Sequence, residues 1–245
     1  MVCAATFYMA ASKKLTVKNA LTYLPLISLV IYLYTMTVLA SFDVVDSFIY
    51  IVLYTLLGFA WLYYGLMAMA YFFDLSWVDD ALNMNNKAAL FSVTGGFLGL
   101  TIIYAGANIG DGPGWWCVVF AGGLGLAAWI LIALVVNKFT KVFERITVER
   151  DISCGIRIGS YLLASGIILG RASAGDWTSF SMTIIEFWVG WPVLPLALLA
   201  ILSEFYFIYK SEPHNNKEQN NITSSIFLSA VYTAIAIASV ISAPL

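Results

Sequence analysis

The sequence predicts an all-α fold: a polytopic bundle of about seven transmembrane helices. Hydrophobic residues make up 61% of the 245 residues and charged residues only 11%, whereas a soluble domain is about half apolar and about a quarter charged. Several stretches also reach the roughly 20 apolar residues that a membrane-spanning helix needs. We therefore expect lipid to solvate a single integral membrane domain, residues 1–245.

The expected spans follow one another along the chain, separated by polar or turn-forming segments. They are residues 21–41, 47–73, 88–107, 115–137, 154–172, 182–209 and 223–243. The linker 109–114, IGDGPG, places Asp111 and Pro113 between glycines. Such a short turn allows only an antiparallel neighbour, so the third and fourth spans should lie side by side.

Basic residues are distributed very unevenly between the connections. If the N-terminus is inside, the inner connections hold Lys13, Lys14, Lys18, Lys87, Lys138, Lys141, Arg145, Arg150, Lys210 and Lys217. The outer connections then hold only Arg171, and Arg157 lies within a span near its inner end. Lysine and arginine are enriched in short loops on the cytoplasmic side of a membrane. We therefore expect the N-terminus inside and the C-terminus outside.

The passages into the third, fifth and seventh spans align with one another and predict an internal repeat. The aligned positions are Asn86 with Arg150 and Asn221, Gly95 with Gly159 and Ala230, and Phe97 with Tyr161 and Tyr232. One N-terminal segment with the first span (1–46) would then precede three parallel two-helix units, 47–107, 115–172 and 182–243. The alternative is a chance alignment of apolar spans rich in small residues.

Small residues recur every four positions in the second helix of each unit. They form GxxxG pairs at Gly95 and Gly99, Gly155 and Gly159, and Gly166 and Gly170, and continue at Ala230, Ala234 and Ala238. Membrane helices associate by close van der Waals contact, which small residues permit. These faces predict tight helix packing, either within the chain or with another copy.

Four charged side chains lie inside or at the edges of the expected spans. A charge at the centre of a membrane helix costs about 2.5–3.5 kcal/mol on insertion scales. Because the fifth and sixth spans are antiparallel neighbours, we expect Arg157 near Glu204 at the inner face and Arg171 near Glu186 at the outer face. The pairs would be structural locks, unless the arginines snorkel toward headgroups or the charges line an ion pathway.

Pro192 and Pro195 predict a kink or break in the sixth span, because proline lacks a backbone donor and crowds the preceding turn. Broken helices line binding sites in many transporters. Proline kinks are nevertheless common in membrane helices of every kind.

Enzymatic, metal and nucleic-acid functions have little support in the sequence. It contains no HExxH, GxSxG or Walker A motif. Its three cysteines are widely spaced, and His214 is its single histidine. We expect no metal, cofactor or catalytic residue. A net charge of -2 argues against a nucleic-acid partner. An intramembrane enzyme is a third hypothesis only because Glu186 and Glu204 could shuttle protons.

Two stretches carry a family resemblance. DLSWVDDALNMNN leading into KAALFSVTGGFLGLTI resembles the domain of unknown function 350 family of small bacterial inner-membrane proteins, as does ITVERDISCGIRIGSYLLASGIILGRA. The family pattern of an asparagine, small residues and a glycine-rich helix matches at Asn86, Ala88, Ala89, Gly95 and Gly99. The resemblance covers about 47–243 and implies a multi-pass protein of the bacterial inner membrane without an established activity.

The favoured hypothesis is a non-enzymatic membrane protein that acts as an assembling or scaffold component. Besides membrane lipid, its expected partners are further copies of itself or other subunits of a membrane complex, and a cytoplasmic partner at the inner connections. The alternative is an ion or small-solute transporter or channel that uses the charged residues of the fifth and sixth spans.

Overall fold

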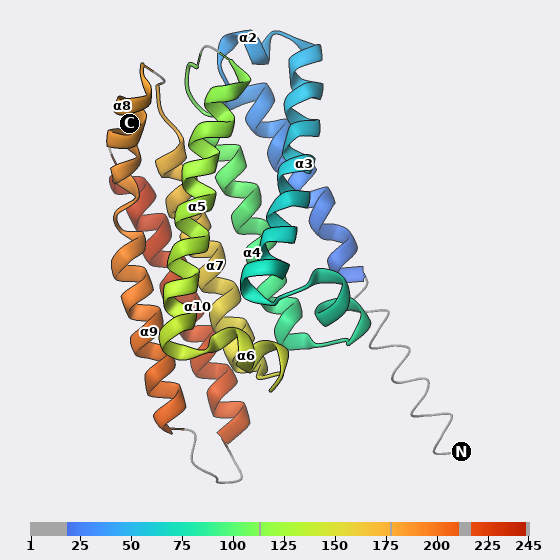
Figure 1. Ribbon diagram of the computed structural model, residues 1–245, viewed down its shortest axis with the longest axis vertical. Helices are drawn as coiled ribbons and strands as arrows, with labels where there is room; N and C mark the ends of the chain where they lie inside the picture. The colour runs from blue at the N-terminus through green and yellow to red at the C-terminus, as the bar shows by residue number, and fades with distance from the viewer. Residues whose placement is uncertain (1–18, 113, 177, 211–216, 244–245) are drawn as a thin grey trace, which may run out of the picture.

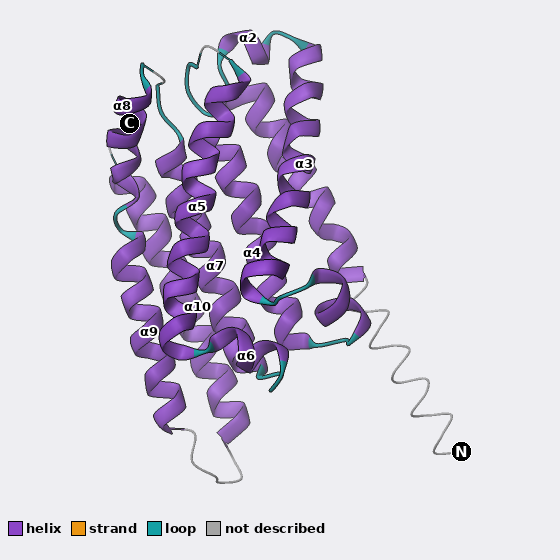
Figure 2. Ribbon diagram, viewed as in Figure 1, coloured by secondary structure: helices purple, strands orange, loops and turns teal. Residues whose placement is uncertain are grey.

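The computed structural model describes residues 19–112, 114–176, 178–210 and 217–243, and this part of the chain is a bundle of helices (Figure 1, Figure 2). Within it, seven helices are long and apolar enough to cross a membrane. These helices are Asn19–Leu39, α3 (Phe48–Phe73), α4 (Lys87–Ala107), α5 (Trp115–Thr140), α7 (Ile152–Ser173), the interrupted helix Phe180–Tyr209, and Ile222–Ser242 within α10 (Lys217–Ser242). The ends of each helix agree with those of an expected span to within about three residues, which confirms the prediction of seven helices long and apolar enough to cross a membrane.

Short helices occupy the two ends of the bundle. At the top of Figure 1, α2 (Phe42–Val45) follows the π-helical last turn of the first helix, η1 (Thr35–Leu39). At the bottom, η2 (Trp77–Asn83) and α6 (Val142–Thr147) precede α4 and α7. We call the bottom the basic end, because it holds Lys87, Lys138, Lys141, Arg145 and Arg150. The top, with Asp43, Asp46, Asp111, Asp176 and Glu186, is the acidic end.

Two parallel helices, α4 and α7, form the centre of the bundle. Each has 72% of its most apolar window buried, whereas no other spanning helix exceeds 33%. Both run from the basic end to the acidic end (Figure 1). On α4 pack the helices α3 and α5, and on α7 pack α5, α9 and α10. The first helix is tied to α4 by a 2.7 Å hydrogen bond between Ser28 and Thr101.

The backbones of α4 and α7 touch along a line that we call the glycine seam. A Cβ atom placed on Gly95 would overlap the carbonyl oxygen of Gly159, and one on Gly106 would overlap that of Gly170. One on Gly166 would overlap the Cα of Gly99. Gly155 also lies in the seam, where it meets Ala88. The seam therefore contains all six glycines that the sequence predicts to mediate packing, and Gly106 in addition. The seam brings the helix axes closer than any side chain would allow.

The same local device starts both central helices. Asn85 and Arg150 adopt left-handed backbone conformations, with φ of 52° and 57°. The next residue then caps the helix: Asn86 accepts hydrogen bonds from the N–H groups of Ala88 and Ala89, and Asp151 from that of Cys154. These side chains satisfy N–H groups that the first helical turn leaves without partners.

The caps correct one detail of the proposed repeat. The sequence alignment matches Asn86 with Arg150, but the capping residue of α7 is the next one, Asp151. Judged by the capping residues, Asn86 of α4 corresponds to Asp151 of α7. The division into three repeated units stays a prediction.

The sixth span breaks at its prolines. α8 (Phe180–Phe187) ends in a 3-10 turn, η3 (Trp188–Gly190), and α9 (Val193–Lys210) begins directly after Pro192. Pro192 therefore stands at the helix boundary and Pro195 in the first turn of α9. Neither position needs a backbone donor, because the first N–H groups of a helix have no intrahelical acceptor.

A single methyl group should be enough to disturb the glycine seam. We expect Gly95→Ala to destabilise the protein by about 1–3 kcal/mol, because the new Cβ has no room beside Gly159. The matched control is Gly123→Ala in α5, where a Cβ would meet no atom within 4 Å. Helix propensity should make this control neutral or more stable by up to about 1 kcal/mol. Thermal unfolding in detergent, followed by circular dichroism, measures both; equal effects would contradict the packing of the seam.

Candidate functional site

Four charged side chains gather at the basic end of the bundle, and we call them the charge cluster. They are Arg145 of α6, Asp151 at the N-cap of α7, Arg157 of α7 and Glu204 of α9. Arg157 is 1% exposed and Glu204 is fully buried. Two arginines and two carboxylates sum to zero formal charge, which lowers the cost of placing them in apolar surroundings.

Arg157 and Glu204 form the centre of the cluster. The Nε of Arg157 donates to Oε1 of Glu204 at 2.5 Å, and its Nη2 donates to Oε2 at 2.7 Å. Such two-point pairing between a guanidinium and a carboxylate is stronger and more specific than a single hydrogen bond. The structure thus brings together the inner pair expected from the sequence and joins α7 to α9 with it.

Arg157 also joins α10 to the cluster. Its Nη1 donates to Oγ of Ser225 at 2.8 Å, and its Cζ lies 4.0 Å from the centroid of the Phe207 ring. The aromatic face attracts the cation that lies against it. One arginine on α7 therefore contacts side chains of both α9 and α10.

Arg145 completes the coordination of Glu204 from the basic end. Its Nη1 donates to Oε2 of Glu204 at 2.8 Å and its Nη2 to Oδ2 of Asp151 at 2.6 Å. Burial by itself favours the neutral form of Arg145, but the carboxylates of Glu204 and Asp151 help to outweigh burial, and the pKa of Arg145 is raised. Arg145 therefore keeps its positive charge at any physiological pH.

The outer pair expected from the sequence does not form. Among the described residues, the ion pairs are those of Arg145 with Asp151 and Glu204 and of Arg157 with Glu204. Arg171 instead donates to the carbonyl oxygen of Ala174 at 3.5 Å, and the carboxylate of Glu186 lies beside Gly175. Both side chains are only half-buried, so water and headgroups can solvate them and no desolvation cost forces them together.

Sequence reasoning missed Arg145, Asp151, Ser225 and Phe207 as members of this site. Arg145 and Asp151 were assigned to a connection between spans, which favours a solvated role. One usable signal was present: an aspartate directly before an apolar helical run is a capping residue and lies at the membrane boundary. Nothing in the sequence indicates that α6 folds back under α7 and brings Arg145 to Glu204.

A polar groove of about 420 Å³ opens beside the cluster at the basic end. Its lining residues are Thr140, Lys141, Glu144, Arg145, Glu149, Asp151 and Ile208. The groove reaches the two outer members of the cluster, but neither Arg157 nor Glu204 belongs to its lining. Toward the acidic end, α7 buries apolar side chains such as Leu162 and Ile168, and its buried Ser165 and Ser173 donate to backbone carbonyl oxygens of α7. In the part of the chain that the structure describes, no charged side chain other than Arg157 and Glu204 is buried.

The described residues contain no group of three or more histidine, cysteine, aspartate or glutamate side chains arranged to hold a metal ion. The cluster joins α6, α7, α9 and α10 through charge-assisted hydrogen bonds.

Comparison with known proteins gives one match. A family model, Domain of Unknown Function (DUF350), matches residues 112–243, which is more than half of the chain. The chain belongs to the DUF350 family. No curated protein and no solved structure matches it.

The DUF350 match covers α5 to α10 and therefore contains the whole charge cluster together with α7. It does not reach residues 47–107, which also resemble the family by their own motif, so the matched range is shorter than the expected 47–243. In this DUF350 protein, α4 thus lies outside the matched range although it forms half of the glycine seam.

Removing the buried carboxylate should be costly. We expect Glu204→Gln to destabilise the protein by about 3–5 kcal/mol, because Arg157 would keep its charge in a buried site without a counter-ion. The matched control, Glu186→Gln, should change stability by about 0.5 kcal/mol or less, because that side chain is half-buried and forms no ion pair among the described residues. Chemical unfolding in mixed micelles measures both variants.

A double variant separates a charge effect from a packing effect. Arg157→Met combined with Glu204→Met removes both buried charges at similar volume, so its loss of stability should be smaller than that of Glu204→Gln alone. A double variant that is less stable than Glu204→Gln would show that hydrogen bonding, not charge compensation, dominates the site.

Proposed function

We propose that this DUF350 protein is a non-enzymatic integral membrane protein that assembles with a second copy of itself through α10. The observation that carries the proposal is the position of the α10 small-residue stripe. Ala230, Ala234 and Ala238 are all exposed, whereas the glycines of α4 and α7 face each other inside the chain.

The two sides of α10 differ in a way that supports self-assembly. Ser225, Tyr232 and Ala236 are buried, and α10 packs chiefly on α7. The alanine stripe lies on the exposed side of the same helix. Of the seven spanning helices, α10 has the smallest buried share, 17%. Small side chains four residues apart permit close contact with another helix in lipid, where no hydrophobic effect drives association.

The charge cluster supports a structural role over transport. Arg157 and Glu204 are buried, mutually paired and coordinated by Arg145 and Ser225. Charged residues inside a membrane commonly mark ion pathways when they continue across it, whereas Arg157 and Glu204 are the only buried charged side chains among the described residues. The pair therefore acts as a lock between α7, α9 and α10, and keeps α10 in place for assembly.

The location and further partners follow from charge and family. We propose the bacterial inner membrane, with the basic end in the cytoplasm, because lysine and arginine gather in cytoplasmic loops. The polar groove beside Arg145 would then be the cytoplasmic surface available to a soluble partner, while lipid surrounds the spans.

Widening the alanine stripe should weaken assembly. We expect Ala234→Leu to raise the dissociation constant of the dimer by about tenfold or more, because each lost 1.4 kcal/mol corresponds to a factor of ten. Light scattering after size-exclusion chromatography in detergent measures the mass. The control is Ala127→Leu on α5, an equally small exposed residue outside the stripe. A wild-type monomer at all concentrations would contradict the proposal.

Transport is tested separately with purified protein in liposomes. We expect proton and potassium fluxes no faster than those of protein-free liposomes, because no charged side chain besides Arg157 and Glu204 is buried in the described part of the bundle. The opposite outcome is an ion flux through the wild-type protein that is lost in Arg145→Gln, while this variant still elutes as a single species. That result would establish the charge cluster as an ion pathway.

A further inference from the structure

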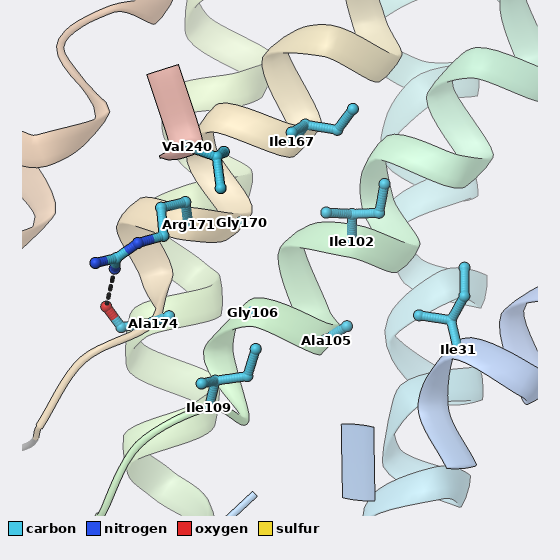
Figure 3. Close-up of a pocket in the computed structure, with 10 residues that line it drawn as sticks. All are labelled: Ile31, Ile102, Ala105, Gly106, Ile109, Ile167, Gly170, Arg171, Ala174 and Val240. Atoms are coloured by element: carbon cyan, nitrogen blue, oxygen red, sulfur yellow. Dashed lines mark hydrogen bonds between the residues drawn. The ribbon is translucent and has the colours of Figure 1, made fainter. Parts of the chain in front are cut away.

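An apolar groove of about 350 Å³ opens on the flank of the bundle where neither the first helix nor α10 covers the glycine seam (Figure 3). Ile31 of the first helix and Val240 of α10 form its two sides. Gly106 of α4 and Gly170 of α7 lie between them. Because these glycines carry no side chain, the surface is hollowed where the two central helices touch.

The groove faces the hydrocarbon region of the membrane. Its lining comes from four spanning helices and is almost entirely apolar. A void beside packed atoms loses their dispersion contacts, so a chain of matching chemistry fills it favourably. In a membrane-spanning bundle, the chain at hand is a lipid acyl chain.

One cation stands at the end of the groove nearest the acidic end. The stem of Arg171 belongs to the groove lining, and its guanidinium is turned toward the carbonyl oxygen of Ala174, just past the end of α7 (Figure 3). Arginine commonly buries its stem in an apolar surface and extends its head to the headgroup region.

The charges of the acidic end make this arginine distinctive. In the part of the chain that the structure describes, Arg171 is the only basic residue at this end. The acidic side chains there are Asp43, Asp46, Asp111, Asp176 and Glu186. An anionic headgroup is therefore repelled along most of this surface and attracted at the mouth of the groove. A guanidinium matches the geometry of a phosphate through two parallel donors.

We propose that the groove binds one anionic phospholipid, with an acyl chain lying over Gly106 and Gly170 and the phosphate on Arg171. The lipid covers the part of the glycine seam that the described residues leave open. This site is separate from the alanine stripe, so it can exist whether or not the protein forms dimers.

Native mass spectrometry of the full-length protein, titrated with dioleoylphosphatidylglycerol or dioleoylphosphatidylcholine, tests the site. We expect the first phosphatidylglycerol to bind about tenfold more tightly than phosphatidylcholine, as a charge-assisted hydrogen bond would provide. Arg171→Gln should abolish this preference and Arg171→Lys should retain part of it. The control Lys138→Gln removes one exposed positive charge at the other end and should leave the preference intact.

Filling the groove tests the acyl-chain part of the proposal. Val240→Trp should weaken the binding of both lipids, whereas Ile237→Trp, an exposed position on the same helix outside the groove, should not. Glycerol phosphate, which has the headgroup chemistry without an acyl chain, should not compete. An unchanged preference in Arg171→Gln, unchanged lipid binding in Val240→Trp, or competition by glycerol phosphate would each overturn the proposal.

Discussion

Backbone contact between α4 and α7 is the constraint on which the rest of the bundle depends. Because glycines replace side chains along the contact, the two helices approach until a methyl group at Gly95 or Gly106 would overlap the opposite backbone. The pair becomes the most buried part of the protein, and the remaining spanning helices pack around it. The same close contact leaves a hollow over Gly106 and Gly170 that none of the described helices covers.

The charge cluster solves a different problem at the basic end. There α10 packs chiefly on α7, α9 packs on both α5 and α7, and α9 and α10 contact each other little. Arg157 contacts side chains of both helices, and Arg145 ties Glu204 to the cap of α7. A buried pair adds little net stability compared with an apolar core, but losing one partner is costly. Any arrangement that separates Arg157 from Glu204 would leave a buried charge without a partner.

The success of the sequence predictions depends on how strongly lipid constrains each residue. The spans were predictable because an apolar helix of about 20 residues has no other stable environment. The partnership of Arg157 with Glu204 was predictable because both charges lie deep in apolar segments and must compensate each other. The same reasoning failed for Arg171 and Glu186, since both lie near a helix end where solvent is available. Arg145 was missed because only the fold of the α6 connection brings it to Glu204.

The membrane-spanning character, the positions of the long helices, the break in the sixth span and the close packing of the α4 and α7 glycines could all be read from the sequence. These properties follow from local chemistry: hydrophobic length, missing donors at proline and missing side chains at glycine. Three features emerge only from the three-dimensional arrangement: the glycines of α4 and α7 meet each other, the α10 alanines are exposed, and Asp151 caps α7. The reason is that a small-residue face favours close contact with any suitable helix, and the choice of partner depends on the positions of all the others.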